Sequence, residues 1–191
     1  MRMNEVLQTS RLDLKPAGVE DAEELFPHLS NPGISRDMAW SPHLEVSETL
    51  AFLEAVQRSH EAGTARHWTI RHEGEVIGLF SLIDIRRRHR AITYDRAELA
   101  YWLSPAYQRR GFMSEAGREL VRAAFEELGL ENLVVAHHVG NAASEGLIRR
   151  LGFVYSHRED RAFRKDDVWI DCLHYRLPRA VWQQTRTADP T

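Results

Sequence analysis

The pattern of hydrophobic and polar positions divides the first part of the chain into extended and helical segments. Residues 11 to 14 alternate and predict a first strand. Apolar residues recur at helical spacing over residues 19 to 29, and Asn31-Pro32-Gly33 predicts the end of that helix. A second helix is predicted from Ser47, a candidate N-cap, with Leu50 and Leu53 facing inward and Ala51 and Phe52 as further candidates.

The rest of the chain shows a run of strands and then strands that alternate with helices. Two strand-like segments are predicted at residues 67 to 71 and 76 to 85, joined by a tight turn at Glu73-Gly74. Further strands are predicted at 98–103, 133–139, 153–157 and 168–177, and helices at 114–128 and 142–151. This order predicts a mixed α/β (α+β) fold whose sheet carries helices on both faces.

Length and charge narrow the class of protein. The 191 residues predict one domain over residues 1 to 184, followed by a polar, flexible tail at 185 to 191. A net charge of −3 does not favour a nucleic-acid partner. The single cysteine, Cys172, excludes an internal disulfide and indicates a reducing compartment. No apolar signal core or membrane-length apolar run is present, so a cytoplasmic protein without membrane contact is expected.

A short loop around Gly111 joins a predicted strand to a long predicted helix. Such a junction directs free backbone N–H groups and the positive end of the helix dipole at one point, which suits a phosphate. Gly111 allows close approach of a ligand, and Arg109 and Arg110 add positive charge. The alternative is that the glycine only permits a sharp turn and the arginines are solvated. One glycine without a Lys-Ser/Thr pair matches neither a Walker loop nor a dinucleotide fingerprint.

The sequence Gln108-Arg109-Arg110-Gly111-Phe112-Met113 resembles the acyl-CoA pyrophosphate loop of the GNAT superfamily of N-acetyltransferases, Q/R-x-x-G-x-G/A. Met113 replaces the usual Gly or Ala, which is similar to the RimJ/RimL-like branch. Other segments resemble that branch in the same order, namely 9–14 with 20–26, 98–103, 141–144 with 151–153, and 171–177. The resemblance covers about residues 9 to 177. It implies a mostly antiparallel, twisted sheet flanked by helices.

The resemblance also implies acetyl-CoA as co-substrate, with direct transfer of the acetyl group to an amine and no metal. The backbone of Trp102 and Leu103 would pair with the pantetheine arm, and Asn141 would bind that arm farther along. The N–H groups of residues 109 to 114 would hold the pyrophosphate. The implied cofactor-binding residues are Trp102, Leu103, Gln108, Arg109, Arg110, Gly111, Phe112, Met113, Ser114 and Asn141.

The resemblance assigns the catalytic residues less fully than the cofactor-binding residues. Many members use a tyrosine as the acid for the departing thiolate, and here that position is Ile148. Ser144 is the nearest substitute, with helix capping as its alternative role. Glu98 is the candidate general base, directly or through water, and the alternative is an ion pair with Arg96. Tyr101 should lie on the opposite face of the strand from Glu98.

The acceptor amine is the open part of the function. The leading hypothesis is the N-terminal α-amine of a protein; the alternatives are a small amine (polyamine, amino acid or antibiotic) and a non-catalytic CoA-binding module. Residues 31 to 46 and 86 to 96 would build the acceptor cleft. Acidic residues lining that cleft would favour a polycationic small molecule, and an open groove with backbone-binding groups would favour a peptide end. The basic run 86 to 90 is interpreted as solvated rather than as a dock for an acidic partner or ribosomal RNA. A monomer or homodimer is expected. No zinc spacing is found, and His137-His138 would point to opposite faces of a strand.

Overall fold

The computed structural model describes residues 6 to 187, and its centre is one eight-stranded sheet in the order β1-β2-β3-β4-β5-β6-β8-β7. The strands are β1 (Leu7–Gln8), β2 (Asp13–Pro16), β3 (Arg66–His72), β4 (Glu75–His89), β5 (Ile92–Leu103), β6 (Asn132–His138), β7 (Val154–Lys165) and β8 (Val168–Pro178). Only β5 and β6 pair in parallel, and the other neighbours are antiparallel. The predicted mixed, mostly antiparallel sheet is therefore confirmed.

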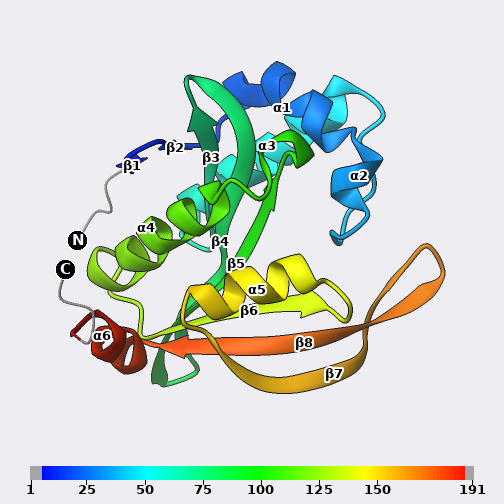
Figure 1. Ribbon diagram of the computed structural model, residues 1–191. Coiled ribbons are helices and arrows are strands. Elements are labelled where there is room, and N and C mark those ends of the chain that lie inside the picture. Colours follow the sequence, from blue (N-terminus) through cyan, green and yellow to red (C-terminus); the bar gives the residue numbers. More distant parts are fainter. Residues whose placement is uncertain (1–5, 188–191) are drawn as a thin grey trace.

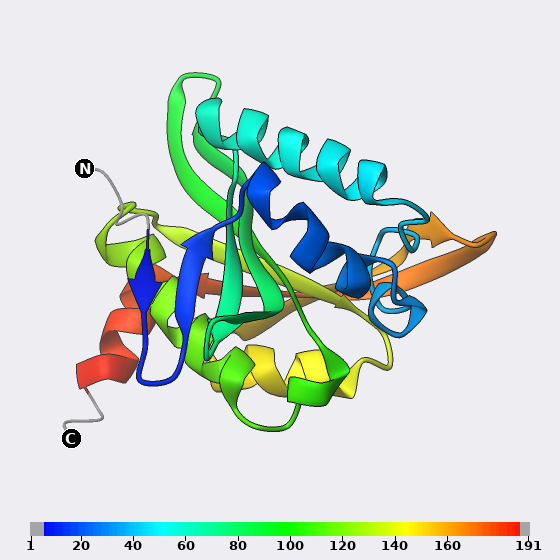
Figure 2. The same cartoon turned by 90° about the horizontal axis from the view of Figure 1, so that it is seen from above.

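Helices cover both faces of the sheet, as predicted. They are α1 (Ala22–Leu29), α2 (Pro32–Ser35), α3 (Val46–Glu61), α4 (Phe112–Glu126), α5 (Ala142–Arg150) and α6 (Arg179–Thr187), with short 3-10 turns η1 (Val19–Asp21) and η2 (Pro105–Tyr107). Figure 1 shows α4 and α5 in front of the strands, and Figure 2 shows α1 and α3 on the opposite side. None of the described helices is long and apolar enough to cross a membrane.

Two hydrophobic clusters hold these layers together, and β5 takes part in both. Leu99 and Leu103 belong to the larger cluster, which includes the buried face of α4. Trp102 belongs to the smaller cluster, together with Leu25 of α1 and Leu53 of α3. Because successive side chains of a strand point to opposite faces, β5 is the central strand of the packing.

Several predicted features of the first half differ in the structure. Asn31 does not simply end a helix; its side chain accepts a hydrogen bond from the Gly33 amide at 2.8 Å and caps α2. The N-cap of α3 is Glu45 rather than Ser47. The prediction for Leu50 is wrong, since that side chain is 40% exposed. Leu53 is buried as predicted, and the buried stripe of α3 continues through Thr49 and Val56 rather than through Leu50.

Two segments have more regular structure than their polar sequences indicate. The basic run 86 to 90 was expected to be a loop, but it extends a hairpin in which Arg86 pairs with Arg96 and His89 with Ile92. This hairpin projects from the body of the molecule (Figure 2), and its arginines are exposed. Residues 185 to 187 of the predicted tail belong to α6, whose Trp182 packs on Phe125 at 5.0 Å between ring centroids. Residues 188 to 191 lie outside the described part of the chain.

Candidate active site

A gap between β5 and β6 creates the site. These two strands pair only from Arg96 to Glu98, opposite residues 132 to 134, and then part. From Leu99 to Leu103, β5 therefore has a strand neighbour only on its β4 side. Buried backbone N–H and C=O groups need hydrogen-bond partners. The free edge of β5 thus suits an extended ligand that carries amide groups of its own.

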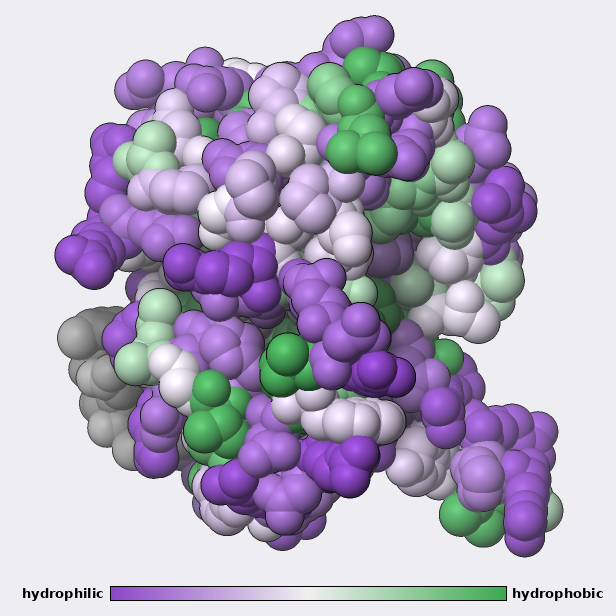
Figure 3. Space-filling view, turned by 90° about the vertical axis from the view of Figure 1, so that its right-hand side faces the viewer, coloured by the Kyte–Doolittle hydropathy of each residue, from purple (hydrophilic) through white to green (hydrophobic). Residues whose placement is uncertain are grey.

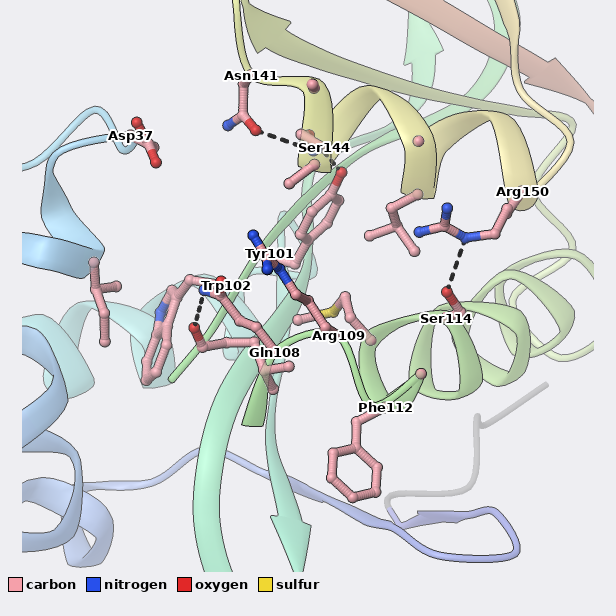
Figure 4. Close-up of a pocket in the computed structure, with 18 of the residues that line it drawn as sticks. Asp37, Tyr101, Trp102, Gln108, Arg109, Phe112, Ser114, Asn141, Ser144 and Arg150 are labelled. Carbon is pink, nitrogen blue, oxygen red and sulfur yellow. Dashed lines mark hydrogen bonds between the residues drawn. The ribbon is translucent and has the colours of Figure 1, made fainter. Parts of the chain in front are cut away.

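A cleft of about 560 Å³ lies at this gap. Its walls come from residues 33 to 38, the end of β5, the Gly111 loop with the start of α4, and α5 (Figure 4). On the side that carries α2, the molecular surface is hollowed between an upper and a lower part (Figure 3). Every site residue predicted from the sequence lines this cleft except Glu98 and Arg110.

The Gly111 loop has the backbone geometry of an anion site. Arg109 and Gly111 both adopt left-handed conformations, with φ of 60° and 81°. Left-handed residues in a turn gather successive N–H groups into a concave anion-binding surface. Helix α4 begins directly afterwards at Phe112, so its first amides have no acceptor within the helix. The structure therefore places unpaired donors and a helix N-terminus at the same wall of the cleft.

Arginine side chains add positive charge to this wall, although not all of the predicted ones do so. Arg109 lines the cleft, and so does Arg150 of α5, whose Nε lies 3.4 Å from the Ser114 hydroxyl (Figure 4). Neither guanidinium forms an ion pair with a carboxylate of the described residues. Arg110 instead stacks over the Phe112 ring, 4.9 Å from its centroid. Only the backbone of Arg110 remains a candidate for ligand binding.

A partly buried carboxylate lies behind the loop, and no local motif in the sequence indicates its partners. Glu115 accepts hydrogen bonds from Thr9 Oγ1 at 2.6 Å, Ser10 Oγ at 3.0 Å and Arg11 Nε at 2.7 Å. Arg11 also donates to the Arg110 carbonyl at 3.2 Å. Burial alone would raise the pKa of Glu115, but the hydrogen bonds from Thr9, Arg11 and Ser10 outweigh it and lower that pKa to about 2. This network fixes the start of α4 to the β1–β2 turn.

Replacing Glu115 by glutamine should lower the free energy of unfolding by roughly 2 kcal/mol at pH 7. The lowered pKa means that the carboxylate stabilises the fold above the ordinary value of 4.5, and that this contribution is lost as the pH falls towards about 2. Urea unfolding of both proteins at pH 7, 4 and 3 tests this, with the exposed Glu23→Gln as control. A difference that does not shrink on acidification would contradict it.

Ser144 and Tyr101 form a hydroxyl pair in the cleft. Their oxygens lie 2.8 Å apart (Figure 4). The Ser144 amide donates to Asn141 Oδ1 at 3.0 Å, so Asn141 caps α5 and the serine hydroxyl is not used for capping. Burial raises the pKa of Tyr101 to about 12, against a smaller lowering by the Ser144 hydrogen bond. The phenol therefore keeps its proton at neutral pH. Ile148, which stands where many family members have a tyrosine acid, is buried in the core.

Glu98 occupies the other face of β5, as strand alternation predicts. It is half-buried and does not line the cleft. Burial raises the pKa of its carboxyl group, and the charges of Arg96 and His174 act in the opposite direction. Direct contact with a ligand in the cleft is therefore not expected of Glu98, and a role as general base remains a prediction that would require a bridging water.

Three side chains that sequence spacing did not connect lie together on β7 and β8. His157, Glu159 and His174 present nitrogen and oxygen atoms within 4.8 Å of one another, an arrangement that could hold a metal ion. His174 Nε2 lies 2.9 Å from Glu159 Oε2. The pairing is across strands, with His157 opposite His174, so it has no signature along the chain. This cluster does not line the cleft.

The fold and the cleft together suit an extended ligand that carries amide and anionic groups. Residues 11 to 154 match the family model described as an acetyltransferase (GNAT) domain. The chain belongs to this family, and it is an acetyl-CoA-dependent N-acetyltransferase. The family predicted from the motifs around Gly111 is thereby confirmed.

Individual relatives agree with the RimJ/RimL-like branch. The uncharacterized N-acetyltransferase YoaA of Bacillus subtilis (strain 168) is 28% identical over 150 residues, covering 78% of this chain and 82% of the relative. The ribosomal-protein-serine acetyltransferase of Escherichia coli (strain K12) is 30% identical over 116 residues, 61% of this chain and 62% of that protein. The solved structure of RimL, a ribosomal L7/L12 alpha-N-protein acetyltransferase in complex with coenzyme A, superposes with a TM-score of 0.84 at 21% identity, covering 91% and 98% of the two chains.

Proposed function

We propose that this enzyme acetylates the N-terminal α-amine of a protein. The observation that carries the proposal is the charge of the cleft: Asp37 is the only acidic residue among the described residues that line it. One carboxylate matches one ammonium group, whereas a polyamine would require several. Residues 86 to 96 contribute nothing to the cleft. The relative from Escherichia coli, named for a ribosomal-protein serine, supports the same acceptor class.

The residues of the cleft fit acetyl-CoA, which supplies the activated acetyl group as a thioester. The amides of residues 109 to 114 and the guanidinium of Arg109 hold the pyrophosphate. The unpaired edge of β5 at Trp102 and Leu103 takes the pantetheine amides. Gln108 Nε2 already donates to the Leu103 carbonyl at 3.0 Å, so Gln108 acts by shaping this edge. Phe112, Met113 and Ser114, at the start of α4, also line the cleft.

The Ser144–Tyr101 pair supplies the proton for the departing thiolate in this proposal. Tyr101 retains its proton at neutral pH, and the 2.8 Å hydrogen bond allows either hydroxyl to pass a proton to the other. The two residues come from β5 and α5 and meet in the cleft beside Asn141 (Figure 4). We therefore assign the role to the pair rather than to Ser144 alone.

Ser144→Ala and Tyr101→Phe should each lower kcat about tenfold, and the double variant should lose little more than either single one. Two residues that act as a unit give such non-additive losses. Tyr107→Phe is the control, because its hydroxyl bonds to Glu75 and not to a group of the cleft. Steady-state rates of CoA release decide the question. Full activity of both single variants would remove the pair from catalysis.

The acceptor is tested with purified protein, acetyl-CoA and three probes, by measuring release of free CoA. The probes are a peptide with a free N-terminal serine, the same peptide with a blocked N-terminus and an internal lysine, and spermidine. We expect acetylation of the first peptide alone. Turnover of spermidine but not of the peptide would favour the small-amine alternative. Binding of acetyl-CoA without acetylation of any probe would reject the proposed acceptor.

A further inference from the structure

Asp37 lies in the wall of the cleft that residues 33 to 38 form, apart from the Gly111 loop. Figure 4 shows this side chain across the cleft from the Arg150–Ser114 side, facing the start of α5 at Asn141. We infer that Asp37 binds the ammonium group of the acceptor, and that Lys165 and His138 are positioning residues that hold it there. This inference rests on the proposed function, since it assumes that the acceptor enters the cleft as a primary amine.

Lys165 fixes the backbone on both sides of Asp37. Its Nζ donates to the carbonyl of Met38 at 2.8 Å, lies 3.4 Å from that of Arg36 and also bonds to that of Ser35. An ammonium group has three donors, and here all of them find carbonyl acceptors in the last residue of α2 and the segment that follows it. Lys165 lies at the end of β7, so the hairpin formed by β7 and β8 holds the Asp37 segment from far along the chain.

His138 fixes the side chain of Asp37. Its Nε2 lies 3.2 Å from Asp37 Oδ1, and Arg36 Nε lies 3.5 Å from the same oxygen. His138 is the last residue of β6, and its other ring nitrogen faces the Val139 carbonyl at 3.1 Å. Within the described residues, no hydrogen-bond donor contacts Asp37 Oδ2. One carboxylate oxygen is thus held by the protein, and the other remains available to a cation.

The surroundings make a bond to this oxygen selective for a single positive charge. The other charged residues that line the cleft, Arg109 and Arg150, are both basic. They repel a second ammonium group on the same molecule. A carboxylate that accepts from an ammonium forms a charge-assisted hydrogen bond, which is roughly twice as strong as a neutral one. An acetylated amine carries no positive charge and cannot form this charge-assisted hydrogen bond. The site therefore discriminates a free N-terminus from an acetylated N-terminus.

The test compares Asp37→Asn with Glu23→Gln, an equal change of charge at an exposed position outside the cleft. The probes are the free-N-terminal serine peptide and spermidine, each with saturating acetyl-CoA. For the probe that the wild type acetylates, Asp37→Asn should raise the acceptor KM about tenfold or more, which is the loss of a charge-assisted hydrogen bond. The affinity for acetyl-CoA and the kcat should change less than about twofold. Glu23→Gln should behave as wild type.

Lys165→Met and Lys165→Arg test the positioning role. The methionine variant should raise the acceptor KM several-fold with unchanged affinity for acetyl-CoA, and arginine should restore part of the loss because it keeps the donors. Unchanged affinity for acetyl-CoA also shows that the variant is folded. An acceptor KM that is unaffected by Lys165→Met removes the positioning role.

The outcomes separate this inference from the proposed function. If the wild type acetylates spermidine and not the peptide, the α-amine proposal fails, and Asp37 is judged on the KM for spermidine. If Asp37→Asn leaves the acceptor KM at the wild-type value, the ammonium site is overturned while the acceptor assignment stands. If neither probe is acetylated by the wild type, both proposals fail.

Discussion

Replacing Gly111 by valine should weaken the binding of acetyl-CoA about 100-fold, or roughly 2.7 kcal/mol. The backbone at Gly111 has φ of 81°, a conformation that β-branched residues adopt only with strain. An added Cβ would lie 3.5 Å from Arg11 Nη2, so steric conflict inside the protein is minor. The loss arises because relaxation of the strain moves the neighbouring amides, and because the new side chain occupies space that the pyrophosphate requires.

Gly129→Val is the matched control for this experiment. Gly129 also has positive φ, 64°, and nothing lies within 4 Å of an added Cβ. It follows the opposite end of α4, so it carries the same kind of backbone strain without access to the cleft. Isothermal titration with coenzyme A should show normal affinity for the control and weak binding for Gly111→Val. Equal affinities in the two variants would contradict the pyrophosphate assignment.

Glu98→Gln should lower kcat about 100-fold while leaving the affinity for acetyl-CoA unchanged, because removal of a general base affects proton transfer alone. Burial raises the pKa of Glu98 above its ordinary range. A base must be deprotonated to act, so kcat/KM of the wild type should fall as the pH drops through that raised pKa. This acid limb should disappear in Glu98→Gln. The carboxylate would work through water, since it does not line the cleft.

Stability separates a chemical effect of Glu98→Gln from unfolding. A raised pKa means that the fold disfavours the charged carboxylate, so a neutral glutamine should not lower the Tm at neutral pH. Glu73→Gln, at a turn residue whose side chain is 87% exposed, is the control. A wild-type kcat in Glu98→Gln would remove this residue from the proton-transfer role.

The elements with strong local patterns were predictable from the sequence. Helix α4 has regular apolar spacing, and the loop that leads into it at Gly111 consists of residues that are consecutive in the sequence. Its start differs by only two residues, at Phe112 rather than Ser114. Where the apolar pattern is weak, the predicted buried residues can be wrong. Leu50 is exposed, because the buried face of α3 depends on what the helix packs against. The hairpin through residues 86 to 90 was hidden because both of its faces are polar.

The sequence by itself determined the family, the fold class and the loop at Gly111, because these depend on residues that are close together along the chain. Only the tertiary structure decided where β5 and β6 part, which exposes the edge that the cleft uses. It also decided the partners of Glu115, Tyr101 and Asp37, which come from elements far away in sequence. Such contacts depend on how the whole sheet packs against its helices, and no local preference of a residue encodes which distant group will face it.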